Sequence, residues 1–227
     1  MAYTLYIVST PIGNLEDMTY RAVRVLKECS LILAEDTRHT RGLLDFYGIS
    51  TSMESYHDFN KEKVTPRYVQ YLLERGDIAL VSDAGTPGIS DPAFNLVRAS
   101  LQAEIPVRPV PGASAMLAAL VCSGMPTDHF RFEGFSPKKS AQRIHLLERL
   151  KEKSEETAIF YASPHNVDKF LEEIKTVFGN IRIALLREIT KKFEEHLHGT
   201  PDELLAHLSA HPPKGEFVLI FHHQNKG

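Results

Sequence analysis

The sequence predicts an α/β fold in which two successive parts of the chain each build a β-sheet. In the first half, short apolar runs alternate with stretches of helical period, which is typical of a parallel sheet covered on both faces. In the second half, two strand-like runs follow each other without a helix between them, which indicates a mixed sheet. The character of the chain changes at "PVPGASA" (109–115), so we expect an N-terminal domain over 1–111 and a C-terminal domain over 112–227.

Four strands are predicted in the first half, each from a short apolar run: 5–8, 31–34, 78–81 and 107–110. The first helix carries Ala22 and Leu26 at helical spacing, and the second ends at Gly48, a residue type favoured just beyond a helix C-terminus. Two further helices are expected from about Arg67 to Gly76 and from about Pro92 to Gln102.

The second half is expected to begin with a helix over about 113–122 and a strand in "HFRFEGF", followed by a basic helix over about 139–153 and a strand over 157–162. Ser163 and Pro164 then resemble an N-cap followed by proline at the first helical position. Strands are predicted in "IRIALLREIT", "KFEEHLHG" and "EFVLIF", with a capping-box helix starting at "TPDE" (200–203).

Composition limits the classes of protein that fit. The chain has 227 residues and a net charge of −3, so a nucleic acid would have to meet a local basic patch. Cys29 and Cys122 are too few for a disulfide framework, and no clustered Cys/His spacing indicates a metal site. No apolar run approaches the ~20 residues of a membrane span, and the opening residues lack a signal peptide. We therefore expect a soluble, cytoplasmic protein without a membrane partner.

The loop "SDAGTPGISDP" (82–92) follows a predicted parallel strand, at the sheet edge where ligands bind in open α/β folds. Its glycines let backbone approach a ligand, its prolines stiffen the loop, and Asp83 and Asp91 can accept hydrogen bonds from a ribose or cap the next helix. One such loop could be a plain turn, but "STPIGN" (9–14) and "PGAS" (111–114) leave neighbouring strands at the same edge. Without GxGxxG or a P-loop, the ligand is expected to be nucleotide-sized, held by backbone and free of triphosphate.

Several charged groups stand where a polar substrate could bind. In "AEDTRHTR" (34–41) the acids suit a helix N-terminus, whereas Arg38 and Arg41 do not. Lys138, Lys139 and Arg143 lie beside "FEGF" and suggest phosphate contacts, although a solvated helix would look similar. "REITKKF" (187–193) is a second charged group in a strand-like context.

In this order, "TPIGNLEDMTYRA", "AEDTRHT", "ALVSDAGTPGISDP", "VPGASA" and "FEGF.P.K" resemble the ribosomal small-subunit methyltransferase I family of the tetrapyrrole-methylase superfamily, from about Leu5 to Phe221. The resemblance implies two α/β domains of the tetrapyrrole-methylase type with S-adenosylmethionine (SAM) in the cleft between them, and a homodimer. It implies 2′-O-methylation of a cytidine in the decoding region of 16S rRNA in the small ribosomal subunit.

The positions that match the family's cofactor segments are Pro11, Asp83, Gly85, Thr86, Pro87, Gly88, Ile89, Ser114, Ala115, Ala162 and Pro164. Four departures stand out. The family usually has glycine where this chain has Ser9 and Ala93, and often has glutamate and arginine where it has Ala162 and Asn166. The last two put RNA contact or cleft geometry there in question.

Transfer to a hydroxyl needs no metal, because the methyl group of SAM is already activated. The candidates for a general base are Asp36, Glu133 and His57, with Lys191 as a less favoured neutral amine. The candidates for RNA contact are Arg38, Arg41, Lys138, Lys139, Arg143, Arg187 and Lys191. Two alternatives stay open: a tetrapyrrole-type small-molecule methylase, and a non-catalytic rRNA-binding assembly factor.

Overall fold

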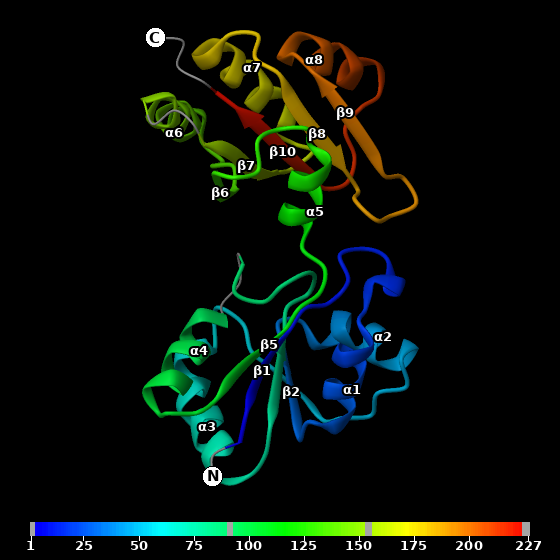
Figure 1. Cartoon of the computed structure of the whole chain (residues 1–227), viewed down its shortest axis with the longest axis vertical. Helices are drawn as coiled ribbons and strands as arrows, with labels where there is room; N and C mark the ends of the chain where they lie inside the picture. The colour runs from blue at the N-terminus through cyan, green and yellow to red at the C-terminus, as the bar shows by residue number, and fades with distance from the viewer. Residues whose placement is uncertain (1–2, 90–92, 153–155, 224–227) are drawn as a thin grey trace. The chain divides into compact units, whose positions relative to one another are not determined.

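The computed structural model describes residues 3–89, 93–152 and 156–223. The chain divides into two compact units, Met1–Ser114 and Ala115–Gly227, and each contains one five-stranded sheet with helices packed on it (Figure 1). Within the described ranges, no helix is both long enough and apolar enough to cross a membrane.

The sheet of the first unit is entirely parallel, as the sequence predicts. Its strands are β1 (Leu5–Val8), β2 (Leu31–Ala34), β3 (Met53–Ser55), β4 (Ile78–Val81) and β5 (Val107–Val110), in the order β3-β2-β4-β1-β5. The edge strand β3 is not predicted from the sequence, because its three residues form no apolar run and pair on one side only. Pro109 is tolerated in β5 because that strand is the other edge.

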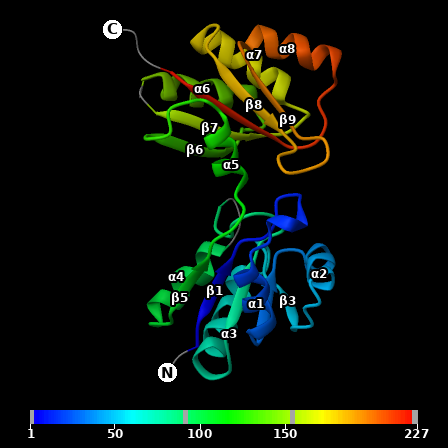
Figure 2. The ribbon, with the colours of Figure 1, turned by 45° about the vertical axis from the view of Figure 1, so that its right-hand side comes forward.

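Helices cover both faces of this sheet. Helices α1 (Tyr20–Glu28) and α2 (Thr37–Phe46) share one apolar core with the sheet, and α3 (Lys61–Glu74) and α4 (Ala93–Gln102) share another on the opposite face. Figures 1 and 2 show the two pairs on the two sides of the strands. A 3₁₀ turn, η1 (Leu15–Asp17), precedes α1.

The start of α3 was predicted too late. The helix begins at Lys61 and passes through Pro66, whereas the sequence suggested a start near Arg67. A proline in a helix removes one hydrogen bond and disfavours helical backbone before it. Buried Thr65 and Tyr68 hold this segment in place, and the Thr65 hydroxyl donates to Lys61 O at 2.6 Å.

The connections define where a ligand can enter. The chain passes from β1 to β2 through α1 on one face, and from β4 to β5 through α4 on the other. Because β1 and β4 are neighbours, the connections that follow them lead to opposite faces of the sheet, and ligands of open α/β sheets bind outside the carboxyl ends at such a point. This is the topological switch point of the sheet.

The sheet of the second unit is mixed, as predicted. Its strands are β6 (Phe130–Phe135), β7 (Thr157–Ala162), β8 (Ile183–Arg187), β9 (Glu195–Gly199) and β10 (Phe217–His222), in the order β6-β7-β10-β8-β9. Only β6 and β7 pair in parallel, and the other pairs are antiparallel. Gly134, with φ of 71°, lies within the register shift of β6.

Helices α6 (Ser140–Glu152), α7 (Val167–Phe178) and α8 (Pro201–Ala210) pack on one face of this sheet, and α5 (Ala115–Cys122) packs on the other. The capping box of α8 is confirmed: Thr200 and Glu203 each bond to the other's backbone N–H. The predicted start of α7 at Pro164 is wrong. Ser163 instead accepts the amides of Asn166 and Val167 in a turn, and the helix starts three residues later.

Candidate cofactor and RNA site

The loops that leave β1, β4 and β5 are tied together at the switch point. Thr10 N donates to Gly85 O at 2.9 Å, and Gly85 N donates to Thr10 O at 3.1 Å. The Thr86 hydroxyl donates to Ala113 O at 3.1 Å, so the Ser9 hydroxyl, 2.9 Å away, is the donor to Thr86. Three loops far apart in sequence therefore form one connected rim.

The centre of this rim is a tight turn at "TPGI" (86–89). Ile89 N donates to Thr86 O at 3.3 Å, and Gly88 has φ of 91°. Proline followed by a glycine of positive φ is the signature of a type II turn. Gly85, with φ of 78°, also needs the freedom of glycine. The turn leaves the Ile89 side chain 40% exposed at the rim.

A close approach between the β1 and β5 loops fixes the width of the rim. A Cβ added at Gly112 would lie 2.9 Å from Ser9 Cβ, whereas one added at Gly85 would meet nothing nearer than 3.4 Å. Gly112 is therefore required for space, and Gly85 for its backbone conformation. Ser9, where the family usually has glycine, fills the space that Gly112 leaves.

The β4 loop is also joined to the start of α2. Asp83 Oδ1 accepts the Asp36 amide at 2.9 Å, and Asp36 caps α2 by accepting the Arg38 amide at 2.8 Å. The Arg38 guanidinium binds the same carboxylate, and these hydrogen bonds hold the pKa of Asp36 well below its usual range. A carboxylate so stabilised is a weak base, so Asp36 is poorly suited to remove a proton. The Arg38 side chain itself is 90% exposed, and Arg41 is exposed on the same helix.

The other base candidates lie away from the switch point or are engaged by neighbours. His57 follows the edge strand β3, two strands from β4, or about 10 Å at the usual strand spacing. Its Nδ1 is buried and makes no hydrogen bond to any described residue. Glu133, in the second unit, has a side chain 14% exposed and lies 3.7 Å from Arg131 and 4.0 Å from Arg149.

In the second unit, Ala162, Pro164 and Arg187, which the sequence assigns to the site, lie at the same end of neighbouring strands. The register aligns Phe217 with Ala162 on one side and with Arg187 on the other, and Pro164 follows directly in the turn after β7. Arg187 Nε lies 3.3 Å from Glu195 Oε2, and its Nη2 lies 3.5 Å from Phe193 O. The Arg187 guanidinium thus binds residues of the β8–β9 hairpin to which it belongs.

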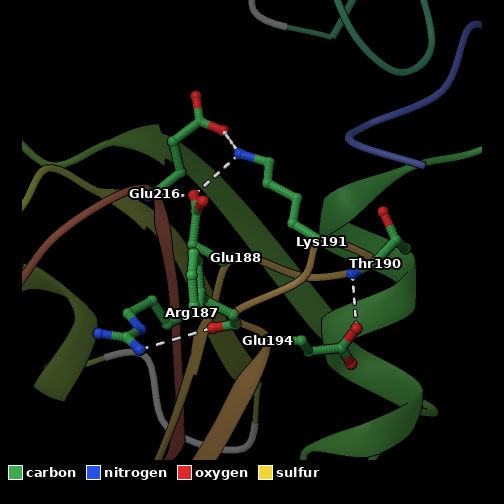
Figure 3. A network of polar contacts seen from close by, with 7 residues as sticks. Arg187, Glu188, Thr190, Lys191, Glu194 and Glu216 are labelled. Carbon is green, nitrogen blue, oxygen red and sulfur yellow. Dashed lines mark hydrogen bonds and ion pairs between the residues drawn. The ribbon is translucent and has the colours of Figure 1, made fainter. Parts of the chain in front are cut away.

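The loop after β8 is held by a network of ion pairs (Figure 3). Lys191 Nζ lies 2.8 Å from both Glu188 Oε1 and Glu216 Oε2, and the Glu216 amide donates to Glu188 Oε1 at 3.0 Å. Thr190 N donates to Glu194 Oε2 at 2.6 Å. Glu188 and Thr190 have φ of 49° and 68°, a conformation that L-residues adopt at a cost. The network compensates for this strain.

Lys191 is fixed as a cation. Burial acts against its charge, but the hydrogen bonds to Glu188 and Glu216 outweigh burial and raise the pKa of Lys191. The same contact lowers the pKa of Glu188. A neutral amine at Lys191 would break this network, so the residue is not set up as a general base.

Arg143 has a structural role. It is buried, and its guanidinium binds both oxygens of Glu173, at 2.5 and 2.7 Å, and the carbonyls of Pro137 and Lys138 at 2.9 Å. Its donors are therefore used within the protein. We leave Arg143 out of the proposed RNA contacts, and we note that it fixes the loop that carries exposed Lys138 and Lys139.

The rim fits a ligand held mainly by backbone. Its amides and hydroxyls join the loops to one another, so the groups that it presents are backbone carbonyls, which can each accept a second hydrogen bond, and Asp83 at one end. Residues 93–152, 156–223 and 3–89 contain no group of His, Cys, Asp and Glu arranged to hold a metal ion. Asp91 and Pro92 of the predicted loop lie outside the described residues.

Sequence reasoning missed Ser9 and Thr10, which bind the loops together. Both stand directly after a predicted buried strand, at the edge where the ligand loop was expected. The position of Ser9 and Thr10 after that strand was therefore the only sign in the sequence that they would join the loops. The partners Glu173, Glu188 and Glu216 left no such signal, because they become neighbours of their cations only through the fold.

Comparison with known proteins agrees with this geometry. The profile of the Tetrapyrrole (Corrin/Porphyrin) Methylases matches residues 4–205. The structure is similar to uroporphyrin-III-C-methyltransferase from Thermus thermophilus, with a TM-score of 0.66, 20% identity, and coverage of 96% of this chain and 94% of that one. It is also similar to a diphthine synthase, with a TM-score of 0.73, 10% identity, and coverage of 97% and 90%. The family match, on this fold, thus defines a SAM-dependent methyltransferase of the tetrapyrrole methylase class.

Sequence relatives narrow the family further. Proteins named ribosomal RNA small subunit methyltransferase I are 48% identical in Halalkalibacterium halodurans, over 96% of this chain and 75% of that protein, and 48% identical in Synechocystis, over 95% and 77%. The Bacillus subtilis protein of this name is 43% identical over 97% and 75%. The chain belongs to the ribosomal RNA small subunit methyltransferase I family.

Proposed function

We propose that this protein transfers a methyl group from SAM to the 2′-oxygen of a cytidine in the decoding region of 16S rRNA, in the small ribosomal subunit. The observation that carries the proposal is the connected rim at the β1/β4 switch point, in a chain whose relatives are named for rRNA methylation. Cytoplasmic location and a homodimer are part of the proposal.

In this proposal the cofactor lies against the rim of the first unit. Pro11, Asp83, Thr86 and the backbone of residues 85–89 hold it from the first unit. Ser114, Ala115, Ala162 and Pro164 are the further positions that the family resemblance assigns to the cofactor. Asp83 keeps one oxygen on the Asp36 amide, so its second oxygen is the one offered to a ligand hydroxyl.

Bound SAM supplies an activated methyl group on a sulfonium. The methyl carbon would pass from the sulfonium sulfur, which would keep the electron pair, to the ribose 2′-oxygen, and the hydroxyl proton would pass to solvent water. The protein holds the oxygen in line, and positioning of this kind supplies about 7–11 kcal/mol of a barrier. Positioning carries the reaction here because Asp36 is too weak a base and Lys191 is held as a cation.

Exposed cations bind the RNA backbone in this proposal. Arg38 and Arg41 stand on α2 beside the rim, and Lys138 and Lys139 stand on the loop that Arg143 fixes. Arg187 and Lys191 instead shape the loop after β8, so they act on RNA through the hairpin that they hold. Accessible, splayed RNA suits such a site, because the 2′-hydroxyl must reach the methyl group.

The test is transfer of labelled methyl from SAM to purified small subunits that lack the modification, with free 16S rRNA in parallel and the modified nucleotide mapped. Asp83→Asn keeps an acceptor for the Asp36 amide, and we expect it to weaken SAM binding about 10- to 100-fold, the value of a hydrogen bond to a charged group. Asp45→Asn, an exposed change on α2, is the control. SAM binding without transfer to either RNA would refute the proposed acceptor, and no SAM binding would refute the enzyme.

A further inference from the structure

A polar groove on the first unit has no place in the site described above. It has a volume of about 290 Å³ and lies beside α1 and the edge strand β5, where its lining includes Tyr6, Arg21, Arg24 and Arg108. One water molecule occupies about 30 Å³ in the liquid. The groove is therefore large enough for a group of several atoms, such as a sugar phosphate. The groove lies on the face of the sheet that α1 covers, next to the edge strand β5.

The groove runs toward the rim. Asp77 stands before β4, at the amino edge of the sheet, whereas Val110 ends β5 at the carboxyl edge, where the cofactor loops begin. Helix α1 runs back from the carboxyl edge, so its first turn, with Arg21, lies at the rim end. A chain lying in the groove would be led to the switch point.

The charge of the lining favours an anion. Of its acids, Glu28 pairs with Arg24 at 2.9 Å, and Asp77 accepts the Thr4 amide at 2.7 Å. Arg21 and Arg108 form no ion pair with any residue that the structure describes, and both are exposed. The Arg24–Glu28 pair is also exposed, and such pairs are weak enough to exchange partners. The groove is therefore a positive site on a chain of net charge −3.

An aromatic side chain stands beside these arginines. Tyr20, the first residue of α1, is 98% exposed and lies one helical turn from Arg24. Exposed aromatic rings next to a basic groove are the usual means of holding single-stranded RNA, since bases stack on the ring while cations follow the phosphates.

We propose that this groove binds the sugar-phosphate backbone of the substrate RNA through Arg21, Arg24 and Arg108, as a track separate from the cations beside the rim. This inference rests on the proposed function, because it assigns part of the same RNA to a second surface. It predicts a binding contribution that depends on salt and is independent of the cofactor.

The test compares two double variants of the full chain that remove equal charge. Arg21→Gln with Arg108→Gln alters the groove, and Lys63→Gln with Arg98→Gln alters exposed positions on α3 and α4, on the opposite face. The probe is an unmodified 16S rRNA fragment containing the target cytidine. Its affinity is measured from 50 to 200 mM KCl, together with SAM affinity, oligomeric state and methyl transfer.

Two lost phosphate contacts lower the slope of log K against log salt by about 1.4 to 1.8. Over this salt range wild type should therefore lose about 7- to 12-fold more affinity than the groove variant. SAM affinity should stay unchanged, and the control should keep the wild-type slope. Arg108→Gln alone, which leaves α1 intact, should show about half the change in slope.

Equal slopes for the groove and control variants would overturn the inference, and so would a change of oligomeric state confined to the groove variant, which would make the groove a subunit interface. The proposed function fails separately, if wild type transfers no methyl group to any RNA. The slopes still decide the groove in that case.

Discussion

Replacing Gly112 by alanine should destabilise the rim through one contact. The new Cβ would lie 2.9 Å from Ser9 Cβ, whereas carbon atoms pack at about 3.5–4.0 Å. Overpacking of this kind costs about 1–3 kcal/mol. Alanine returns about 0.4–1 kcal/mol by restricting the unfolded chain, since Gly112 has no positive φ that would forbid it. The free energy of unfolding should therefore fall by about 1–2 kcal/mol.

Ser9→Gly is the matched background for this test. It removes the opposing Cβ and leaves Ser9 O, at 3.4 Å, as the nearest atom to the new methyl group. By itself it loses the hydroxyl contact to Thr86, which contributes about 0.5–1.5 kcal/mol. In that background Gly112→Ala should be neutral or slightly stabilising. The coupling between the two changes should then equal the packing cost, about 1–3 kcal/mol.

The assay is urea unfolding of the four proteins followed by circular dichroism, with SAM affinity measured in parallel. Gly112→Ala should weaken SAM binding, and the double change should restore it, because the rim returns to its native width. If Gly112→Ala costs the same in both backgrounds within about 0.5 kcal/mol, the Ser9 contact is not the cause and the reasoning fails.

Arg143→Ala should lower the free energy of unfolding by about 3–5 kcal/mol, because it leaves a carboxylate unpaired in a buried site; a melting temperature within a degree of wild type would contradict this. The Lys191 contact holds the pKa of Glu188 below its ordinary 4.5, so its stabilisation is complete above that pH and is lost as pH falls through the lowered value. Glu188→Gln should therefore lower the melting temperature at pH 7 and make it fall less steeply below pH 4.5; parallel melting curves would refute the pairing. Burial raises the pKa of Cys29 to about 11, so iodoacetamide at pH 8 should label only exposed Cys122, and two labels in the folded protein would show that Cys29 is accessible.

The sequence was sufficient for elements whose burial is continuous. The strands β2 and β4 are buried along their whole length, and β1 is buried at both ends, and such strands appear as unbroken apolar runs. The short strand β3 escaped because Met53, Glu54 and Ser55 share no pattern and only a neighbouring strand makes them extended. Both wrong helix starts lie beside a proline. Pro164 resembles the first helical position, but the turn at Ser163 moves the start of α7 to Val167, whereas Pro66 lies inside α3, where buried Thr65 and Tyr68 hold the segment in place.

The site divides in a similar way. Gly85 and Gly88 in the loop after β4 could be assigned from sequence, because a backbone position that needs a positive φ favours glycine. The role of Gly112 could not, since its requirement comes from Ser9, about a hundred residues earlier in the chain and adjacent only through the pairing of β1 with β5. Strand order depends on the whole chain. It decides which residue faces a motif such as Gly112, so the role of that motif cannot be predicted from its own sequence.

The same limit explains why charged residues of one type have different roles. Arg143 and Lys138 stand five residues apart in one basic stretch, yet the first lies buried against Glu173 and the second lies exposed on the loop that the first one binds. Lys191 and Arg38 both face carboxylates, but Lys191 is enclosed by two of them, whereas the Arg38 side chain keeps 90% of its surface in solvent. Each cation that the fold encloses holds a loop in one conformation. The cations on α2, on the loop before α6 and in the α1 groove stay exposed, and these are the ones to which the proposals above assign RNA contacts.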